Sequence, residues 1–413
     1  MKTLWIVNKC CGALHEHVFG KKSTGGLWLE AALEGLCSHP EDSVVVVNIE
    51  KEPALPTYRE GQVTFYTVKG SPNEHYDYRS KTALRQWEEI LRNEKPDVLI
   101  FWGTEFPYGL AAKEVVPEIP AVVFIQGILD SIGKYYCAGL TDAELNKAVT
   151  LRDVLMGTTI RKSQKAFQKR AVYEKKLLNL AGNVILENKW SEAYLKKACP
   201  DINCYRMPIG ISESFQKTHW DKDKMEPHTL MCSAANYPLK GLHMLLKALN
   251  LVKVRYPDVQ LYIPGTVLKQ PNTLMRKLKQ NGYDKLILQM LKELDLEGNV
   301  TYTGRLTSDQ MAEKMASVNC FAMTSAIENH SSTLKEAMTV GVPCVASYVG
   351  GVPEYAINGE NCFLYRYEDY EVLAMRIMEL FENPNALQFN SQVNEQKAGD
   401  YKDLRCILEK IVS

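Results

Sequence analysis

Short runs of apolar, mostly β-branched residues alternate with amphipathic stretches along the whole chain. Runs of this length are typical of buried strands, and their alternation with helical patterns is typical of βα units around a mainly parallel sheet. Helices are expected over stretches such as Leu27–Cys37, Lys81–Asn93 and Phe106–Val116. The strands predicted for the first half are Thr3–Asn8, Ser43–Ile49, Gln62–Val68, Asp97–Trp102, Ala121–Gln126 and Asn183–Glu187.

A polar stretch divides the chain into two halves of similar size. It follows Thr218 and reads HWDKDKMEPH, which is typical of a linker. We therefore predict an α/β protein of two doubly wound, Rossmann-like domains that face each other across a cleft, with the ligand at the carboxyl ends of the strands. The strands predicted for the second half are Thr229–Ala234, Val259–Pro264, Asn299–Gly304, Val318–Thr324, Pro343–Tyr348 and Asn361–Arg366.

The composition is that of a globular protein without an overall electric field. The 413 residues carry 49 basic and 49 acidic side chains, so we expect no nucleic-acid partner. The 11 cysteines show no metal-like spacing and are expected to be reduced. The apolar stretch at the amino terminus is too short for a signal peptide, and no run approaches the roughly eighteen apolar residues of a membrane span. These features predict a cytoplasmic protein.

One segment breaks the alternation of strands and helices. Residues 151–180 are expected to form a long helical stretch, with eight basic residues against Asp153 and Glu174. A basic helix can lie on an anionic surface, which predicts peripheral contact with the inner face of the cytoplasmic membrane. The alternative is a solvated helix face in a neutral protein.

The most informative stretch is TSAIENHSSTLKEAMTVGVPCVAS, residues 324–347. Glu328 lies in the loop after a predicted strand, and the next helix carries Glu336. The N–H groups at a helix start favour an anion such as phosphate. The alternative for Glu336 is a capping box with Thr333, and the alternative for Glu328 is a solvated loop acid. The residues leading into the helix are Ser331, Ser332 and Thr333.

Three further junctions of the second half support the same anion site. Lys240 and Gly241 stand at a helix start, where a cation would reinforce a diphosphate site, although a lone lysine there is often only a surface residue. Gly350 and Gly351 permit close backbone approach before the helix expected at Pro353. Gly304 and Arg305, at the end of a predicted strand, are further candidates for this site.

The first half offers candidate residues for its own side of the cleft. Gly25 and Gly26 precede the helix at Leu27, where they are either a ligand loop or a plain turn before the helix. Glu105 and Gln126 follow two predicted strands and could face the same cleft.

Taken together, these residues resemble the retaining glycosyltransferases of family 4, which have the two-domain GT-B fold. The best marker is the E-x7-E spacing of Glu328 and Glu336, in a block that continues as EAMTVGVPCVAS and VGGVPEYAINGENCFLY. The resemblance implies that Glu328 lies against the donor sugar and that Glu336 binds the ribose hydroxyls of the nucleotide. It also implies that the N–H groups of residues 331–333 hold the diphosphate together with Lys240.

The chain departs from the family pattern at three places. The usual G-R-L is replaced by Ala234, Ala235 and Asn236, so the diphosphate arginine is missing and only Lys240 remains. Gln126 stands where many members have a histidine, and a glutamine can hydrogen-bond a sugar hydroxyl but cannot carry a proton at neutral pH. The usual P-N-G reads Pro208-Ile209-Gly210. Because both glutamates and the lysine remain, the changes fit a subfamily better than an inactive enzyme.

The resemblance implies a domain organisation. An acceptor-binding domain would span residues 1–212 and a donor-binding domain residues 213–390. A terminal helix within residues 391–413 would cross back to the first domain.

The resemblance also implies a reaction. A hexose would move from a UDP- or GDP-linked sugar to a hydroxyl of a glycan or lipid-linked acceptor, with retention, in a setting such as bacterial polysaccharide synthesis. Glu328 and Lys240 are the predicted catalytic residues, and Lys240 would stabilise the charge that grows on the leaving diphosphate. No cofactor or metal is expected, because the acidic pair Asp221 and Asp223 lies in the predicted linker.

Two alternatives to a transferase remain open at this point. A UDP-sugar 2-epimerase would share the architecture and the nucleotide site but would need no acceptor. A non-catalytic two-domain sugar-binding protein would bind no nucleotide.

Overall fold

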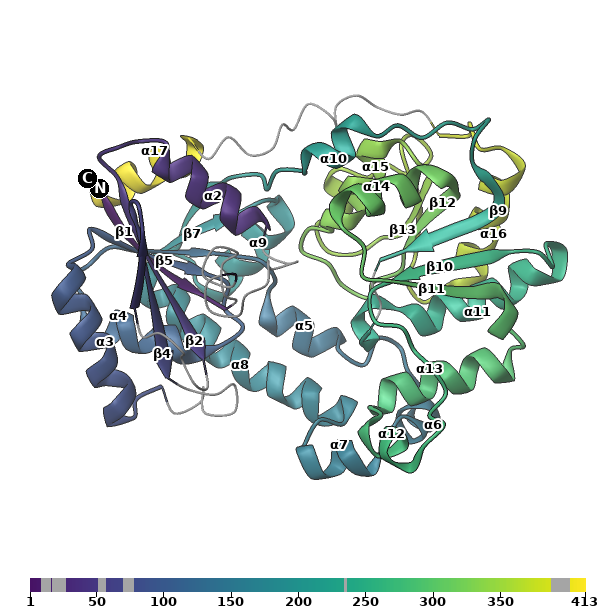
Figure 1. Ribbon diagram of the computed structural model, residues 1–413, viewed down its shortest axis with the longest axis horizontal. Coiled ribbons are helices and arrows are strands. Elements are labelled where there is room, and N and C mark those ends of the chain that lie inside the picture. The colour runs from purple at the N-terminus through teal and green to yellow at the C-terminus, as the bar shows by residue number, and fades with distance from the viewer. Residues whose placement is uncertain (9–15, 17–26, 51–56, 70–77, 234–235, 388–401) are drawn as a thin grey trace. The chain divides into compact units, whose positions relative to one another are not determined.

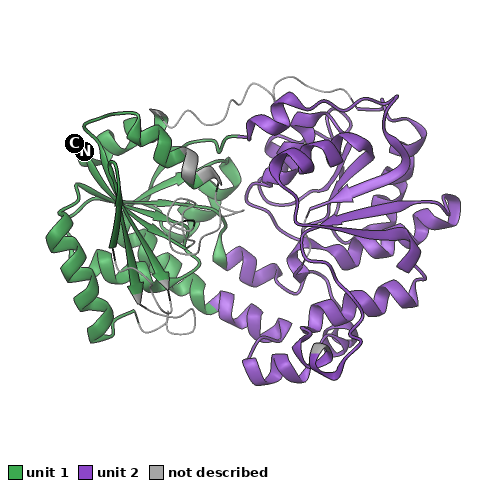
Figure 2. Ribbon diagram, viewed as in Figure 1, with its two compact units in different colours: residues 1–129, 169–210, 397–413 green, residues 130–168, 211–396 purple. Residues whose placement is uncertain are grey.

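The computed structural model describes all residues except 9–15, 17–26, 51–56, 70–77, 234–235 and 388–401 (Figure 1). The chain forms two compact units, coloured green and purple in Figure 2. Unit 1 comprises residues 1–129, 169–210 and 397–413, and unit 2 comprises residues 130–168 and 211–396. Both units are discontinuous in sequence, whereas the predicted boundaries gave discontinuity only to the first domain, through its terminal helix.

Unit 1 is built on an eight-stranded sheet of order β3-β4-β2-β1-β5-β6-β7-β8. Neighbouring strands are parallel except β3 and β4, which pair antiparallel. The strands are β1 (Lys2–Val7), β2 (Ser43–Glu50), β3 (Thr57–Glu60), β4 (Val63–Lys69), β5 (Val98–Trp102), β6 (Ala121–Phe124), β7 (Asn183–Leu186) and β8 (Asn203–Arg206). The helices are α2 (Leu27–Cys37), α3 (Lys81–Glu94), α4 (Leu110–Val115), α9 (Lys189–Ala198) and α17 (Lys402–Val412).

Unit 2 is built on a six-stranded, wholly parallel sheet of order β11-β10-β9-β12-β13-β14. The strands are β9 (Glu226–Cys232), β10 (Gln260–Pro264), β11 (Val300–Gly304), β12 (Val318–Met323), β13 (Cys344–Ser347) and β14 (Phe363–Tyr365). The helices are α5 (Leu129–Tyr135), α6 (Asp142–Lys147), α7 (Leu151–Met156), α10 (Glu213–Lys217), α11 (Leu242–Arg255), α12 (Leu274–Lys279), α13 (Gly282–Glu293), α14 (Ser308–Ser317), α15 (Ser332–Val340) and α16 (Tyr370–Glu382). Helix α8 (Ile160–Ala181) starts in unit 2 and ends in unit 1.

Each sheet is buried on both faces, which explains the nearly continuous apolar runs of its central strands. In unit 1 every residue of β5 and β6 is buried, and Trp102 lies between Trp5 and Phe124 with ring centroids 4.8 and 4.9 Å away. Helix α17 covers part of this sheet, because Leu404 and Leu408 are buried in the same core. The predicted α/β class with two doubly wound parallel sheets is confirmed.

Most predicted strands differ from the observed ones by no more than three residues at an end, but β3 and β8 were not predicted. Both are edge strands whose side chains are largely exposed, so they lack the apolar run that marks the central strands. The helix predicted at Phe106–Val116 is a short 3-10 turn, Pro107–Gly109, followed by α4.

The predicted linker is part of unit 2. Trp220 donates its backbone N–H to Val340 O and its indole N–H to Val318 O, both at 2.8 Å, and Glu226 already begins β9. Although this stretch is rich in polar residues, it packs against the rest of unit 2.

The prediction of one helix over residues 151–180 is wrong. Gly157 adopts a left-handed conformation, with φ of 69°, and ends α7 before α8 begins at Ile160. Its N–H and that of Thr158 close the end of α7 by donating to Val154 O and Asp153 O. The two helices are thus separate elements with different surroundings.

The segment 130–168 joins unit 2 through polar contacts. The buried His243 of α11 lies with Nε2 2.7 Å from Ala138 O, and the Tyr367 hydroxyl donates to the same carbonyl at 2.8 Å. Lys247 and Glu144 form an ion pair at 2.8 Å. Among the described residues, no helix is both long and apolar enough to cross a membrane.

Candidate functional site

The candidate site of unit 2 lies where the strand order reverses. Strands β9, β10 and β11 follow one another toward one edge of the sheet, and β12 then pairs with the other side of β9. Such a switch point is where open α/β sheets bind ligands, because the loops after the two strands leave in opposite directions. The loop after β9 carries Lys240, and the loop after β12 carries Glu328.

The structure brings these two predicted catalytic residues into direct contact. Lys240 Nζ lies 2.5 Å from Glu328 Oε1, and Ser325 Oγ donates to the same oxygen at 2.6 Å. The Lys240 side chain is 25% exposed and that of Glu328 is 13% exposed. The pair therefore remains accessible, and one lysine is fixed at the carboxyl edge of the sheet.

The charge of Lys240 is maintained by its neighbours. Burial acts to lower the pKa of Lys240, but the adjacent Glu328 carboxylate and Tyr237 outweigh burial and raise the pKa above its ordinary value. The ammonium form therefore persists at neutral pH. A phosphate that displaced Glu328 from Lys240 would meet a positively charged ammonium here.

The loops of this site touch through their backbones. Gly241 has φ of 68°, and a Cβ at this position would lie 1.7 Å from Thr324 O. Gly350 has φ of 54°, and a Cβ there would lie 1.8 Å from Glu328 O. The loops after β9, β12 and β13 are thus held together at positions that only glycine fits. Hydrogen bonds from Ala326 N to Leu239 O and from Ser347 Oγ to Ser325 O reinforce this arrangement.

Helix α15 begins just after Glu328. Its N-cap is Ser331, whose hydroxyl accepts the Leu334 N–H at 3.3 Å. Ser332 and Thr333 occupy the first two helical positions, whose N–H groups have no partner inside the helix. The capping box suggested for Thr333 and Glu336 is wrong, because the cap lies two residues earlier.

Glu336 lies one turn into α15 and is partly buried. Burial raises the pKa of its carboxyl to about 7. This shift could not be predicted from local residue patterns, since it depends on how the helix packs in the folded unit. A ligand that offers hydroxyl donors would favour the ionised form.

Three residues beside the start of α15 were not predicted as site residues: His330, Lys335 and Tyr355. The His330 and Tyr355 rings lie 5.0 Å apart, and Lys335 Nζ lies 5.3 Å from the centroid of Tyr355. Burial, with a smaller effect of Lys335, lowers the pKa of His330 to about 3, so the imidazole is neutral. The letters NH and K between the two glutamates could have suggested these residues, but Tyr355 is distant in sequence.

Gly304 and Arg305 lie at the end of β11, away from the loop contacts described above. Arg305 and Asn236 line a hollow of about 160 Å³ with residues from the ends of β10 and β11. Asn236 precedes Lys240 in the same loop, so the hollow adjoins the switch point. Ala234 and Ala235 lie outside the described residues.

On unit 1, the structure describes only part of the predicted acceptor side. Gly25 and Gly26 lie outside the described residues. Asn8 Nδ2 donates to Glu105 Oε2, which joins the loops after β1 and β5. Gln126 is exposed in the loop after β6.

A buried carboxylate supports these unit 1 loops. Glu174 of α8 accepts the Thr104 hydroxyl at 2.6 Å and the Leu129 N–H at 3.0 Å. It thereby links the loop after β5 to the one after β6. In the sequence, Glu174 is distinguishable only as one of two acids in a basic segment.

Within the described part of the chain, no group of three or more His, Cys, Asp or Glu side chains is placed to hold a metal ion. The charged groups that the described residues of the site offer a ligand are Lys240, Glu328, Glu336 and the start of α15.

Part of unit 2 is similar in sequence to known glycosyltransferases. Residues 213–398 match the family model described as glycosyl transferases group 1. N-acetyl-alpha-D-glucosaminyl L-malate synthase of Bacillus anthracis is 31% identical over 128 residues, which are 31% of this chain and 32% of that protein. A GDP-mannose-dependent monoacylated alpha-(1-6)-phosphatidylinositol monomannoside mannosyltransferase of Corynebacterium glutamicum is 26% identical over 162 residues, 38% of each chain. The matched segments thus span about a third of these relatives.

Solved structures resemble the whole chain. A sucrose-phosphate synthase from Thermosynechococcus elongatus superimposes with a TM-score of 0.70 at 15% identity, covering 100% of this chain and 96% of that one. The Anabaena protein HepE, solved in complex with UDP and glucose, gives a TM-score of 0.65 at 17% identity and covers 100% and 99%. The fold is therefore of the GT-B type, and the match to the glycosyl transferases group 1 model lies within residues 213–398.

Proposed function

We propose that this protein is a glycosyltransferase that moves a hexose from a UDP- or GDP-linked sugar to a hydroxyl of a glycan or lipid-linked acceptor. The observation that carries the proposal is the Lys240–Glu328 pair at the switch point of unit 2, beside the start of α15. The pair lies inside the segment that matches the group 1 family model. Relatives named as mannosyltransferases and a neighbour solved with UDP and glucose support this choice of donor class.

Lys240 is proposed to hold the donor diphosphate together with the N–H groups at the start of α15. When the bond between the sugar and the phosphate breaks, negative charge grows on the leaving diphosphate. A fixed ammonium and unpaired N–H groups stabilise that charge without reorganisation. For this, Lys240 must exchange its contact with Glu328 for a phosphate oxygen.

Glu328 is then released to face the sugar. Its carboxylate can accept hydrogen bonds from hydroxyl groups of the hexose. The hydrogen bond from Ser325 Oγ holds the Glu328 side chain against its own loop. Glu336 is proposed to bind the ribose hydroxyls, a contact that requires its ionised form. The hollow beside Arg305 and Asn236 is proposed to take part in nucleotide binding.

Several finer features belong to the proposal. The reaction proceeds with retention and without a metal. The residues proposed to contact the acceptor are Glu105 and Gln126 of unit 1, together with Gly25 and Gly26, which lie outside the described residues. The enzyme is cytoplasmic, with peripheral contact to the membrane and a role in bacterial glycan assembly.

A thermal-shift panel tests the donor site. UDP, GDP, ADP and their sugars are added to the wild type and to Glu336→Ala, with and without a chelator. A ligand at about a hundred times its Kd stabilises the folded protein by roughly 2.7 kcal/mol. We expect one nucleotide to raise the Tm, the variant to lose that shift, and the chelator to have no effect.

The matched control is Glu360→Ala, which removes an exposed carboxylate from the same unit and should keep the shift. The absence of any nucleotide shift in the wild type would contradict the proposal and favour a sugar-binding protein. Conversion of the nucleotide sugar without an acceptor into its 2-epimer would favour the epimerase.

A further inference from the structure

Two short helices of unit 2 expose large apolar side chains. On α7, Leu151 is 63% exposed and Leu155 is 77% exposed, and on α12, Leu274 is 73% exposed. Met156 and Met275 are each 63% exposed on the same two helices. Single exposed apolar residues are ordinary, but a contiguous group of large ones marks an interaction surface.

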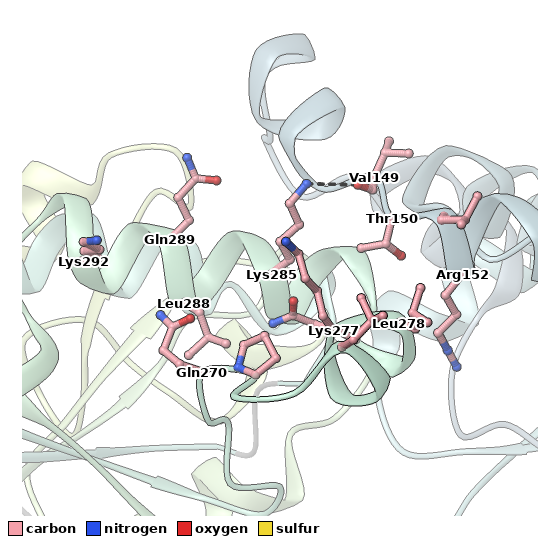
Figure 3. Close-up of a pocket in the computed structure, with 14 residues that line it drawn as sticks. Val149, Thr150, Arg152, Gln270, Lys277, Leu278, Lys285, Leu288, Gln289 and Lys292 are labelled. Atoms are coloured by element: carbon pink, nitrogen blue, oxygen red, sulfur yellow. Dashed lines mark hydrogen bonds between the residues drawn. The ribbon is translucent and has the colours of Figure 1, made fainter.

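The two helices adjoin each other and form one surface. They are in contact, and between them lies a hollow of about 660 Å³, which Figure 3 shows with its lining residues. Leu151, Leu274 and Leu278 supply apolar walls of this hollow, and Leu288 of α13 lies beside them. We call this surface the α7–α12 patch: Leu151, Leu155, Met156, Leu274 and Met275, with the hollow between them.

The rim of the hollow is cationic. Lys277, Lys285 and Lys292 line it together with Arg152, and none of its 14 lining residues is an Asp or Glu. Arg152 pairs with the buried Asp153 at 3.0 Å, so the three lysines make up the surplus charge. Lys285 also donates to Val149 O at 3.1 Å, as Figure 3 shows.

The patch is held firmly by the rest of unit 2. Asp153 of α7 accepts the Gly282 N–H at the start of α13 at 2.5 Å and the Thr158 hydroxyl at 3.0 Å. A Cβ at Gly282 would lie 1.7 Å from Ala148 O, so the backbones are in close contact. The leucines of α7 are therefore presented outward by an anchored helix.

Helix α8, the main part of the basic stretch in the sequence, is less suited to a membrane. Arg161 pairs with Asp142 at 2.6 Å, Lys176 pairs with Glu114, and Arg170 lies 5.0 Å from the Phe106 ring centroid. These three cations are engaged within the protein. The most exposed large apolar residue of α8 is Val172, at 69%.

We propose that the α7–α12 patch inserts into the headgroup region of an anionic lipid membrane, with the three lysines on the lipid phosphates. Large aliphatic side chains beside basic ones are typical of surfaces that lie at this interface. Two copies of the patch would bring like charges together, which disfavours self-association through it. The biological role of this membrane contact rests on the proposed function, since a lipid-linked acceptor would lie at the same interface.

Vesicle co-sedimentation tests the patch. The full chain is mixed with vesicles of phosphatidylcholine alone or with phosphatidylglycerol added, and Leu155→Ser/Leu274→Ser is compared with the wild type. We expect the wild type to bind the anionic vesicles and the double variant to bind more than about tenfold more weakly, since several buried CH₂ groups are lost. Lys277→Gln should weaken binding about fivefold, because each lysine near an anionic surface contributes roughly that factor.

Two control variants separate the patch from other exposed apolar residues. Val254→Ser changes a residue of α11 that is 83% exposed and lies outside the patch, and Val172→Ser changes α8. Both should bind vesicles like the wild type. Loss of binding in Val172→Ser but not in the double variant would overturn the proposal in favour of α8.

Two further results would also overturn it. One is failure of the wild type to bind anionic vesicles. The other is a concentration-dependent dimer in sedimentation velocity that the double variant abolishes, because the patch would then be an interface between copies. The nucleotide thermal shift is measured on the same variants: vesicle binding without any nucleotide shift would contradict the proposed function and leave the patch intact.

Discussion

The loops at the carboxyl ends of the two sheets are fixed in different ways. In unit 2 the loops after β9, β12 and β13 meet backbone to backbone, at Gly241 and Gly350. In unit 1 the loops after β5 and β6 are joined through a side chain, the buried Glu174 carboxylate. Backbone contacts keep Lys240 and Glu328 in a fixed geometry, as the proposed binding of a constant diphosphate requires. Contacts made by a side chain can change by substitution, as the proposed role of unit 1 in binding a particular acceptor requires.

Removing the lysine of unit 2 should have the largest effect. A preorganised donor to a developing negative charge contributes roughly 2.7–4 kcal/mol, so Lys240→Ala should lower kcat for donor turnover on the order of a hundredfold or more. Lys253→Ala is the matched control, because Lys253 also lies on the β9-to-α11 segment and pairs with a carboxylate, Asp295, at 3.0 Å. A decrease of less than about threefold in Lys240→Ala would mean that the donor site is misassigned.

The glycine contacts give the next effect. Gly350→Ala must place a Cβ against Glu328 O as well as adopt a positive φ, so the free energy of unfolding should fall by about 3 kcal/mol or more. Gly359→Ala has φ of 77° but no atom within 4 Å of the added Cβ, and should cost only about 1–2 kcal/mol. Denaturant unfolding measures both. Equal losses would show that the loops do not depend on the close approach.

The side-chain tie of unit 1 should matter less. Glu174→Gln keeps the shape of the side chain but removes one acceptor of a buried network, so we expect a loss of about 1–3 kcal/mol in unfolding free energy. Lys175→Gln, an exposed neighbour on α8, should change little. If the two variants unfold alike, the loops of unit 1 are held by something other than this carboxylate.

The smallest effect concerns the pH dependence of unit 2. The folded pKa of Glu336, about 7, lies above its ordinary value of 4.5, so its contribution to stability is present below about pH 4.5 and is lost as the pH rises through 7. Between about pH 6 and pH 8 this amounts to about 1 kcal/mol. Glu336→Gln should remove that decline in the free energy of unfolding while abolishing nucleotide binding. An unchanged pH profile in Glu336→Gln would argue against the buried carboxyl.

Much of the fold could be predicted because central parallel strands are apolar on both faces. The edge strands β3 and β8 could not, since their exposed residues carry no such signal. Gly157 is a residue that commonly ends a helix, but the helical pattern on both sides of it favoured one continuous helix.

The residues of the candidate site that could be predicted are those in loops directly after strands. Lys240 and Glu328 were expected at one sheet edge, and the structure places them in contact. The close approach of Gly241 to Thr324 and the raised pKa of Glu336 depend on contacts between segments that are distant in sequence, which no local pattern encodes. The same holds for Glu174, whose role depends on two loops that meet only in the folded unit.

The most direct test of the account is calorimetric titration with a nucleoside diphosphate and its monophosphate, using the base that the thermal-shift panel selects. Lys240 and the N–H groups at the start of α15 are proposed to bind the second phosphate. The wild type should therefore bind the diphosphate far more tightly than the monophosphate. In Lys240→Ala that difference should shrink, while the affinity for the monophosphate stays close to that of the wild type. Equal weakening of both ligands in Lys240→Ala, or equal affinity for both in the wild type, would contradict the account.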